Sequence, residues 1–259
     1  MEQTPFLKEG ESKTQKLSTR DSVLEKDYAD LIDMAVHDLD APLRKLSLLV
    51  EMLVGKLSPD KDIQSYIGRI ENCVGDMRSL IDELSVLAGI NTGKKVITAC
   101  NMDTIARRAL QELPVRVNEK EAIVANFSLP EIEGDAGYYT LLFKNLLGNS
   151  IKFSAPDKIP EIHIQSSVLS AEEKERFNLP GEQVYHKIVI TDNGIGFKKE
   201  NAEKIFHPFV RLHGKSKFPG NGIGLAICKK IMDIHHGIIY AEGRENEGAR
   251  FTLVLPEIH

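Results

Sequence analysis

The chain has no uncharged hydrophobic run approaching the roughly 18 residues that a membrane span needs. Its polar N-terminus also lacks the apolar core of a secretory signal. Cysteine is scarce: Cys73, Cys100 and Cys228 lie far apart and form no Cys-x-x-Cys pair, which favours reduced, packed thiols over disulfides or a metal site. These absences predict a cytoplasmic protein with no membrane segment.

An excess of positive charge is lacking as well. The 33 lysines and arginines are outnumbered by 38 aspartates and glutamates, and the resulting net charge of −5 argues against a general nucleic-acid-binding protein. This balance still permits local phosphate binding. With 259 residues, of which 42% are hydrophobic and 27% charged, the composition predicts a globular protein of one large or two modest domains.

The N-terminal part is organised by apolar residues at alternating spacings of three and four, after a polar segment at residues 1–16 that we expect to be a flexible tail. The first series is Val36, Leu39, Leu43, Leu46, Val50, Leu53 and Leu57, and the second is Ile63, Ile67, Ile70, Val74, Met77, Ile81, Leu84 and Ala88. A turn at residues 58–60 separates them, so the pattern predicts an antiparallel hairpin of two long helices.

A single hairpin with such a wide apolar stripe would leave one side in water. A second copy completing a four-helix bundle removes this exposure, so we expect a homodimer through the hairpin. Residues 89–95 contain glycines and are expected to form a hinge. The expected domains are therefore the tail at 1–16, a dimerisation domain at 17–93 and a second domain at 94–259.

The second domain mixes helical and strand patterns. Helices are expected over 101–113, from a cap at Asp135 through Lys152, and over 222–235. Strands are expected over 122–129, 161–168, 184–191, 237–242 and 249–255. Helices intermixed with strands that follow one another late in the chain predict an α+β fold, with helices packed over one mixed sheet.

His37 is the histidine with a setting suited to nucleophilic chemistry. It follows Val36 of the apolar seam and should therefore project toward solvent beside the buried stripe. An exposed helical histidine is usually without function, but the adjacent Asp38 can orient the imidazole and accept a proton from one ring nitrogen, which makes the other a better nucleophile. Pro42 should bend the helix one turn later.

Asn145 and Asn149 lie four residues apart on one helix face, with Lys152 a turn further along. They could be ordinary polar residues of an exposed face. Alternatively, Asn149 supplies an amide oxygen to Mg²⁺ with help from Asn145, while Lys152 meets phosphate oxygens as a point charge. In that case Phe153 would pack near the nucleoside.

Two glycine loops follow. Asp192 ends a predicted strand and precedes Gly194 and Gly196, a pattern that alone more often marks a turn, although its carboxylate suits an exocyclic amine. In the second loop, three glycines open a helix and predict a backbone site for phosphate. These glycines are Gly220, Gly222 and Gly224. A dinucleotide-binding fingerprint has similar spacing but would need a preceding strand. The basic segment between the two loops, from Phe197 to Gly220, is expected to form a lid beside the phosphate site.

In this order, the histidine segment, the asparagine helix and the two glycine loops resemble the sensor histidine kinases of two-component signalling, over roughly residues 30 to 256. The run from Arg211 to Lys230 looks most like kinases found behind phytochrome and PAS sensors. The resemblance implies a dimeric four-helix bundle followed by the α/β-sandwich ATP-binding fold shared with gyrase, Hsp90 and MutL. It also implies that His37 is the phosphoacceptor and Asp38 its acidic neighbour.

The same resemblance assigns the nucleotide site. Asp192 would specify adenine. Thr252 would face the adenine from the last glycine motif, which runs from Gly248 to Thr252. The remaining nucleotide-binding residues implied are Asn145, Asn149, Lys152, Phe153, Gly194, Gly196, Arg211, Gly220, Gly222, Gly224 and Leu225, with Asn149 as the metal ligand. Thus ATP and Mg²⁺ would be held by residues 94–259.

The expected activity is transfer of the γ-phosphoryl group to His37 and then to an aspartate of a response-regulator receiver domain. One alternative is an ATP-driven conformational ATPase of the Hsp90 or MutL type, in which no histidine is modified. Another is a catalytically silent dimeric scaffold. No sensor domain is visible, so the chain is expected to be a fragment of a longer receptor or a kinase driven by a separate sensor.

Overall fold

The computed structural model describes residues 39, 43–52, 61–92, 96–113, 122–125, 127–155, 157–214 and 217–259. The chain divides into a helical unit, Met1–Thr92, and a sheet unit, Gly93–His259. His37 and Asp38 lie outside the described residues. Within the described ranges, no helix combines the length and the apolar character that crossing a membrane requires.

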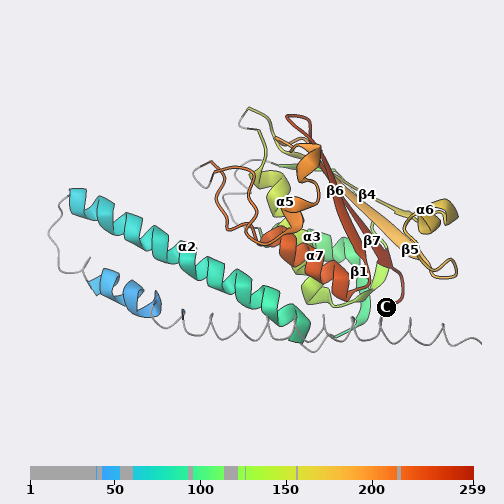
Figure 1. The fold of residues 1–259 in the computed structure, drawn as a ribbon, viewed down its shortest axis with the longest axis horizontal. Coiled ribbons are helices and arrows are strands. Elements are labelled where there is room, and N and C mark those ends of the chain that lie inside the picture. The colour runs from blue at the N-terminus through green and yellow to red at the C-terminus, as the bar shows by residue number, and fades with distance from the viewer. Residues whose placement is uncertain are drawn as a thin grey trace, which may run out of the picture. The chain divides into compact units, whose positions relative to one another are not determined.

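The helical unit contains a helix at residues 43–52 and the long helix α2, Lys61–Thr92 (Figure 1). The two helices pack against each other through a cluster of Leu43, Val74 and Ile81. On α2, four buried apolar positions recur every seven residues, at Ile67, Val74, Ile81 and Ala88, and Ile90 near the end of the helix is buried as well. A seven-residue repeat of buried side chains is the pattern of a helix that meets one neighbour along a straight seam.

The other half of the predicted seam faces outward. Ile70 and Met77, which alternate with the buried positions of α2, are 45% and 42% exposed. The first helix repeats the arrangement, because Leu43 is buried whereas Leu39 and Leu46 are 47% and 46% exposed. Around Ile70 and Met77, the packing between the two helices therefore buries one of the two apolar positions in a heptad and leaves the other exposed, whereas Leu84 further along α2 is partly buried.

The sheet unit is built on a five-stranded sheet in the order β2-β4-β5-β7-β6. Its strands are β2 (Ile123–Val124), β4 (Glu161–Val168), β5 (Tyr185–Asp192), β6 (Ile238–Arg244) and β7 (Gly248–Pro256). The β2–β4 pair is parallel and the other pairs are antiparallel. This is the mixed sheet that the sequence predicted.

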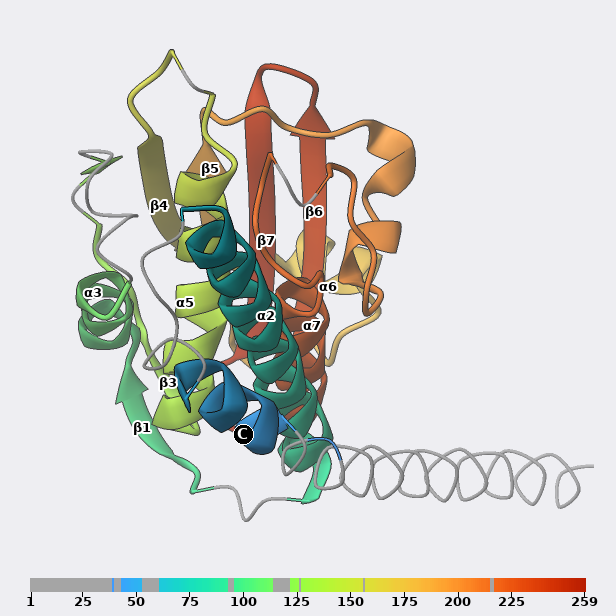
Figure 2. The ribbon, with the colours of Figure 1, turned by 90° about the vertical axis from the view of Figure 1, so that its left-hand side faces the viewer.

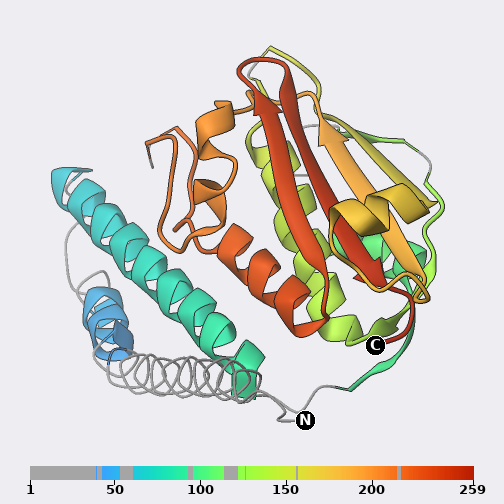
Figure 3. The ribbon, with the colours of Figure 1, turned by 45° about the vertical axis from the view of Figure 1, so that its right-hand side comes forward.

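Helices cover the two faces of this sheet unequally. Figure 2 shows α5 (Ala136–Lys152) and α7 (Gly224–Ile234) along one face, with α3 (Met102–Gln111) beside α5. The short helix α6 (Ala171–Arg176) lies on the opposite face (Figure 3). There Leu169, Tyr185 and Val254 form a small separate cluster. The helices and sheet thus form the expected α/β sandwich.

Some elements differ from the predictions. β1 (Thr98–Asn101) and β3 (Glu131–Gly134) pair with each other in a separate two-stranded antiparallel sheet that was not predicted. The strand expected over 122–129 shrinks to the two residues of β2. Two 3₁₀ turns, η1 (Lys199–Asn201) and η2 (Lys204–Phe206), lie in the segment expected to form a lid.

Helix α5 begins as its sequence predicts. The Asp135 side chain accepts hydrogen bonds from the backbone N–H groups of Gly137 and Tyr138, which satisfies donors that the first helical turn leaves free. Leu142, Leu146 and other apolar side chains of α5 are fully buried. This burial fixes the rotation of α5, and its polar residues Asn145, Asn149 and Lys152 remain only partly covered.

Strand β5 delivers the residue on which the site depends. Ile188 and Ile190 are fully buried, and Asp192 continues their face of the sheet at the end of the strand. The alternation of a strand therefore places one carboxylate under α5, where apolar side chains otherwise fill the space.

Candidate functional site

Asp192 is 7% exposed, and all of its hydrogen bonds in the described structure are to neutral donors. Its Oδ1 accepts the backbone N–H groups of Gly194 at 2.9 Å and Ala249 at 3.1 Å. Its Oδ2 accepts the hydroxyl of Ser150 at 3.1 Å. Burial raises the pKa of the Asp192 carboxyl, and these three hydrogen bonds oppose the rise. The result is a fixed buried acceptor at the end of β5.

The backbone around Asp192 is too close for side chains. A Cβ on Gly194 would lie 2.7 Å from the carbonyl oxygen of Phe153. Gly196 has φ +59°, and a Cβ there would lie 1.9 Å from the carbonyl oxygen of Arg244. Gly248 has φ +101°, and a Cβ there would lie 1.9 Å from the carbonyl oxygen of Asp192. Glycine is required at these positions because the loops fold tightly around the carboxylate.

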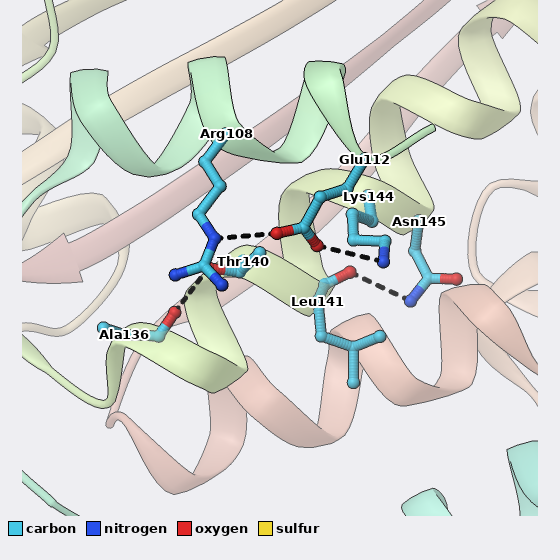
Figure 4. Close-up of polar contacts among 7 residues, drawn as sticks. All are labelled: Arg108, Glu112, Ala136, Thr140, Leu141, Lys144 and Asn145. Atoms are coloured by element: carbon cyan, nitrogen blue, oxygen red, sulfur yellow. Dashed lines mark hydrogen bonds and ion pairs between the residues drawn. The ribbon is translucent and has the colours of Figure 1, made fainter. Parts of the chain in front are cut away.

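Lys144 and Asn145 are adjacent on α5, but their side chains point to different neighbours (Figure 4). The Asn145 amide donates to the carbonyl of Leu141 at 3.0 Å, and its Oδ1 would lie 2.5 Å from a Cβ on Gly224. The Asn145 oxygen is therefore directed at the first residue of α7. Lys144 instead reaches Glu112, which also accepts from Arg108, so this network joins α3 to α5.

Asn149 and Lys152 follow Asn145 along the same helix. Among the described residues, the Asn149 side chain makes no hydrogen bond and is only partly buried, so its amide remains available to a ligand. Lys152 Nζ lies 4.4 Å from the centroid of the Phe153 ring, and a Cβ on Gly220 would be 2.8 Å from this nitrogen. The α5 ammonium group therefore lies against the second glycine loop.

An aromatic group borders the same loop. Phe153 lies 5.0 Å from Phe218 and 6.3 Å from His213, measured between ring centroids. Arg211 donates from Nη2 to the Phe218 carbonyl at 2.9 Å, which closes the segment between them. A planar apolar surface beside a buried carboxylate is suited to a nucleobase.

The second glycine loop leads directly into α7. Gly220 and Gly222 have φ values of +131° and +78°, and a Cβ on Gly222 would lie 2.8 Å from the carbonyl oxygen of Val210. Gly224 and Leu225 are the first residues of α7, and among the described residues no side chain caps that end of the helix. Free N–H groups at a helix start attract anions. Together with Lys152 they form a place for phosphate groups.

Thr252 lies away from this site. It pairs with Val189 on β5 and Tyr240 on β6, and Val189 is three residues before Asp192. Because successive strand residues alternate between faces, Thr252 points to the face opposite Asp192. This corrects the expectation that Thr252 faces the adenine. On β7, Ala249 is the residue that reaches Asp192, through its backbone N–H.

Three contributors were missed by the sequence prediction: Ser150, Ala249 and His213. Ser150 sits between Asn149 and Lys152 in the predicted motif, and its hydroxyl could have drawn attention to it. The position of Ala249 directly after a glycine gave no comparable signal. Within the described ranges, no group of three or more histidine, cysteine or acidic side chains forms a metal cage.

Comparisons with known proteins show which family this chain resembles. Residues 134–259 match the family described as histidine kinase-, DNA gyrase B-, and HSP90-like ATPase. The phytochrome-like protein Cph1 of Synechocystis is 34% identical over 238 residues, which cover 90% of this chain and 30% of Cph1. Cyanobacterial phytochrome A of Nostoc is 31% identical, with 90% of this chain and 29% of the relative covered. The chain thus spans about a third of the length of these relatives.

Solved structures show the same fold. Full-length ShkA, in a complex with AMPPNP, matches with a TM-score of 0.65 at 19% identity, over 88% of this chain and 45% of that protein. The histidine kinase AdeS of Acinetobacter baumannii matches with a TM-score of 0.57 at 16% identity, over 85% of this chain and 98% of the AdeS chain.

Proposed function

Since the chain is a transmitter core of the sensor histidine kinase family, with its ATPase domain at residues 134–259, we propose that it transfers the γ-phosphoryl group of ATP to His37. The observation that carries this proposal is the buried Asp192 carboxylate, held by Gly194, Ala249 and Ser150 beside an open helix start. Such an arrangement offers an acceptor to a base and N–H donors to phosphates within one unit.

Different residues of the site would contact different parts of the nucleotide. Asp192 would accept a hydrogen bond from the adenine amine, and Phe153 would pack against the base. Lys152 and the N–H groups at the start of α7 would contact the phosphates. Arg211 would hold the lid by its bond to the Phe218 carbonyl. Gly194, Gly196, Gly220, Gly222 and Gly224 let the backbone approach the ligand.

Mg²⁺ fits this donor set. Mg²⁺ in nucleotide sites is usually held by one or two protein oxygens together with phosphate oxygens and waters, so a dedicated protein cage is not needed. Asn149 offers an amide oxygen that has no partner among the described residues. Bound there, the ion would neutralise phosphate charge. Asn145 is held by Leu141 beside Gly224 and would position the same part of the nucleotide.

Transfer to His37 needs little covalent help from the protein, because phosphoryl transfer is promoted mainly by positioning and by neutralising charge. Asp38 would accept a proton from one ring nitrogen of His37 and leave the other to attack. The phosphoryl group would then pass to an aspartate of a response-regulator receiver domain. His37 and Asp38 lie outside the described residues, so their roles rest on the sequence.

Dimerisation through the helical unit is part of the proposal. Ile70, Met77, Leu39 and Leu46 form an exposed half-seam on a hairpin whose other half-seam is buried. A second hairpin would cover this half and complete a four-helix bundle. The proposed partners are therefore a second copy of the chain and a receiver domain, and the proposed setting is the cytoplasm.

The test is incubation of the chain with γ-labelled ATP and Mg²⁺, followed by measurement of label on the protein. Label that is lost in acid and kept in base indicates phosphohistidine and supports the kinase. ATP hydrolysis without label on the protein would favour a conformational ATPase instead. Absence of both nucleotide binding and label would favour a silent scaffold.

A further inference from the structure

Ser150 lies between the Asp192 carboxylate and the backbone of its own helix. Its side chain is 2% exposed. Its Oγ lies 3.1 Å from Asp192 Oδ2 and 3.2 Å from the carbonyl oxygen of Leu146. A hydroxyl has one hydrogen, so it can donate to only one of these oxygens at a time. Ser150 is therefore a buried donor with two acceptors, one of which belongs to the nucleotide site.

The two oxygens of Asp192 are held unequally. Oδ1 accepts two backbone N–H groups, from Gly194 and Ala249, whereas Oδ2 accepts only the Ser150 hydroxyl among the described residues. A carboxylate oxygen can accept two hydrogen bonds, so Oδ1 is satisfied and Oδ2 has one position left. Oδ2 is thus the oxygen that a ligand donor can use.

We propose that Ser150 is a positioning residue for base recognition, which keeps Asp192 turned so that Oδ2 is presented to the exocyclic amine of adenine. This inference rests on the proposed function, because it places the nucleotide at Asp192. When the amine arrives, the Ser150 hydroxyl can stay on Oδ2 or turn to the Leu146 carbonyl. Neither arrangement leaves a buried hydroxyl without a partner, so the exchange avoids a desolvation penalty.

The ligands selected in this way are 6-aminopurine nucleotides. An amine donates to the carboxylate, whereas the 6-oxo group of guanine would bring a lone pair against it. A protonated Asp192 could donate to a 6-oxo group, and donation by Ser150 opposes protonation because it stabilises the charged form. Ser150 therefore acts on the base through Asp192, and its removal should weaken ATP more than ligands that lack the amine.

The experiment compares ATP with purine riboside triphosphate, which carries hydrogen in place of the 6-amino group, by calorimetry on the full chain and on Ser150→Ala. For ATP we expect Kd to rise about tenfold, the usual effect of losing a hydrogen bond to a charged group. For purine riboside triphosphate we expect a rise of less than about threefold, because the amine contact is already missing. Equal losses for both ligands would mean that Ser150 only packs, and would overturn the proposal.

Thr140 provides a matched control on the same helix. Its hydroxyl makes the same type of bond, to the carbonyl four residues earlier at Ala136, at 2.7 Å (Figure 4). In the described structure it makes no hydrogen bond to Asp192. Thr140→Ala should leave both affinities unchanged. Ser150→Thr keeps the hydroxyl, so the preference for ATP over purine riboside triphosphate should return even if the added methyl group weakens both ligands alike.

Two further outcomes keep this inference separate from the proposed function. If Ser150→Ala does not fold, Ser150→Cys preserves the shape with a weak donor and should show the same amine-dependent loss. If it shows equal losses for the two ligands, the inference fails. If the parent chain binds no ATP, the proposed function fails. If the parent chain binds ATP but the Ser150 variants lose the same affinity for ATP and for purine riboside triphosphate, this inference alone fails.

Discussion

The helical unit and the sheet unit differ in how completely they bury their own apolar residues. In the sheet unit, Ile188, Ile190 and Leu253 have no exposed surface. In the helical unit, Ile70 and Met77 stay 45% and 42% exposed although they belong to the same seam as the buried Val74. Large exposed apolar side chains in a regular series are typical of a surface that meets a partner.

This difference separates two tasks. A rigid, self-contained sheet unit can hold a nucleotide in fixed geometry, as the three hydrogen bonds to Asp192 indicate. A hairpin that buries only half of its apolar seam gains further stability when a partner covers the other half. Its structure can therefore depend on a second copy or on a signal from a neighbouring segment.

The proposed phosphoacceptor gives the largest effect. His37→Gln should abolish acid-labile label completely, because glutamine has no nucleophilic ring nitrogen. Nucleotide affinity and dimerisation should stay at the level of the parent chain, since the substitution leaves the sheet unit and the seam intact. Persistent acid-labile label on the variant would contradict the assignment and move the nucleophile to another histidine.

The second effect lies in the sheet unit, at Asp192. Asp192→Asn should weaken ATP at least about 100-fold, because an amide N–H₂ on the Ser150 side faces the adenine amine as a second donor. The fold should tolerate asparagine: its oxygen can keep the N–H groups of Gly194 and Ala249, while Ser150 accepts from the amide and donates to Leu146. Calorimetry with ATP and ADP measures the loss.

The stability of the same variant has a definite sign. The pKa of Asp192 is raised above 3.8 in the folded chain, chiefly by burial, so the folded state binds more protons than the unfolded state as the pH rises through this range. The ionised Asp192 carboxylate therefore lowers the free energy of unfolding at neutral pH. Asp192→Asn should unfold at an equal or higher denaturant concentration at pH 7, and this advantage should shrink toward pH 4. A large loss of stability at pH 7 would contradict this reasoning.

The sequence predicted the parts of the fold that depend on local signals. Helix α5 was predicted with its Asp135 cap because capping and apolar spacing are read from neighbouring residues. β4 agrees with its predicted range, 161–168, because an alternating run of that length is unambiguous. β1 and β3 were missed because each has four residues and is stabilised by pairing with the other, about 30 residues away.

The candidate site shows the same boundary between local and distant information. The tight loops around Asp192 could be predicted because such turns require glycine at particular positions. The adenine-binding role of Asp192 came from the family resemblance and stays a prediction. The role of Ser150 depends on a contact with a residue 42 positions away, which no local pattern contains. Thr252 was misplaced because a motif does not reveal which face of the strand each residue occupies, whereas the register of β7 does.

The fourth prediction tests the exposed half-seam. Met77→Glu should weaken dimerisation about 10- to 100-fold, because it places an unpaired charge in a surface that becomes buried. ATP affinity should not change, since the sheet unit is complete by itself. Val86→Glu is the matched control, because Val86 is also exposed on α2, at 37%, but lies outside the seam. Sedimentation over a dilution series measures both; equal behaviour of the two variants would refute the half-seam.

The smallest effect concerns α6, which lies on the face of the sheet opposite α5 and α7 (Figure 3). Ser170 accepts the N–H of Glu173 at 3.2 Å, and the Glu173 carboxylate accepts the N–H of Ser170 at 3.0 Å, so each satisfies a donor that the helix start leaves free. Ser170→Ala should cost about 1 kcal/mol of unfolding free energy, a decrease of about 2–4 °C in the melting temperature of the sheet unit. ATP affinity should be unchanged, because the hydrogen bonds to Asp192 in the described structure come from Ser150, Gly194 and Ala249 and none comes from α6. Dimerisation should also be unchanged, because α6 belongs to the sheet unit and not to the helical unit that carries the half-seam. A change in either would mean that α6 contributes to nucleotide binding or to dimerisation, and would contradict this prediction.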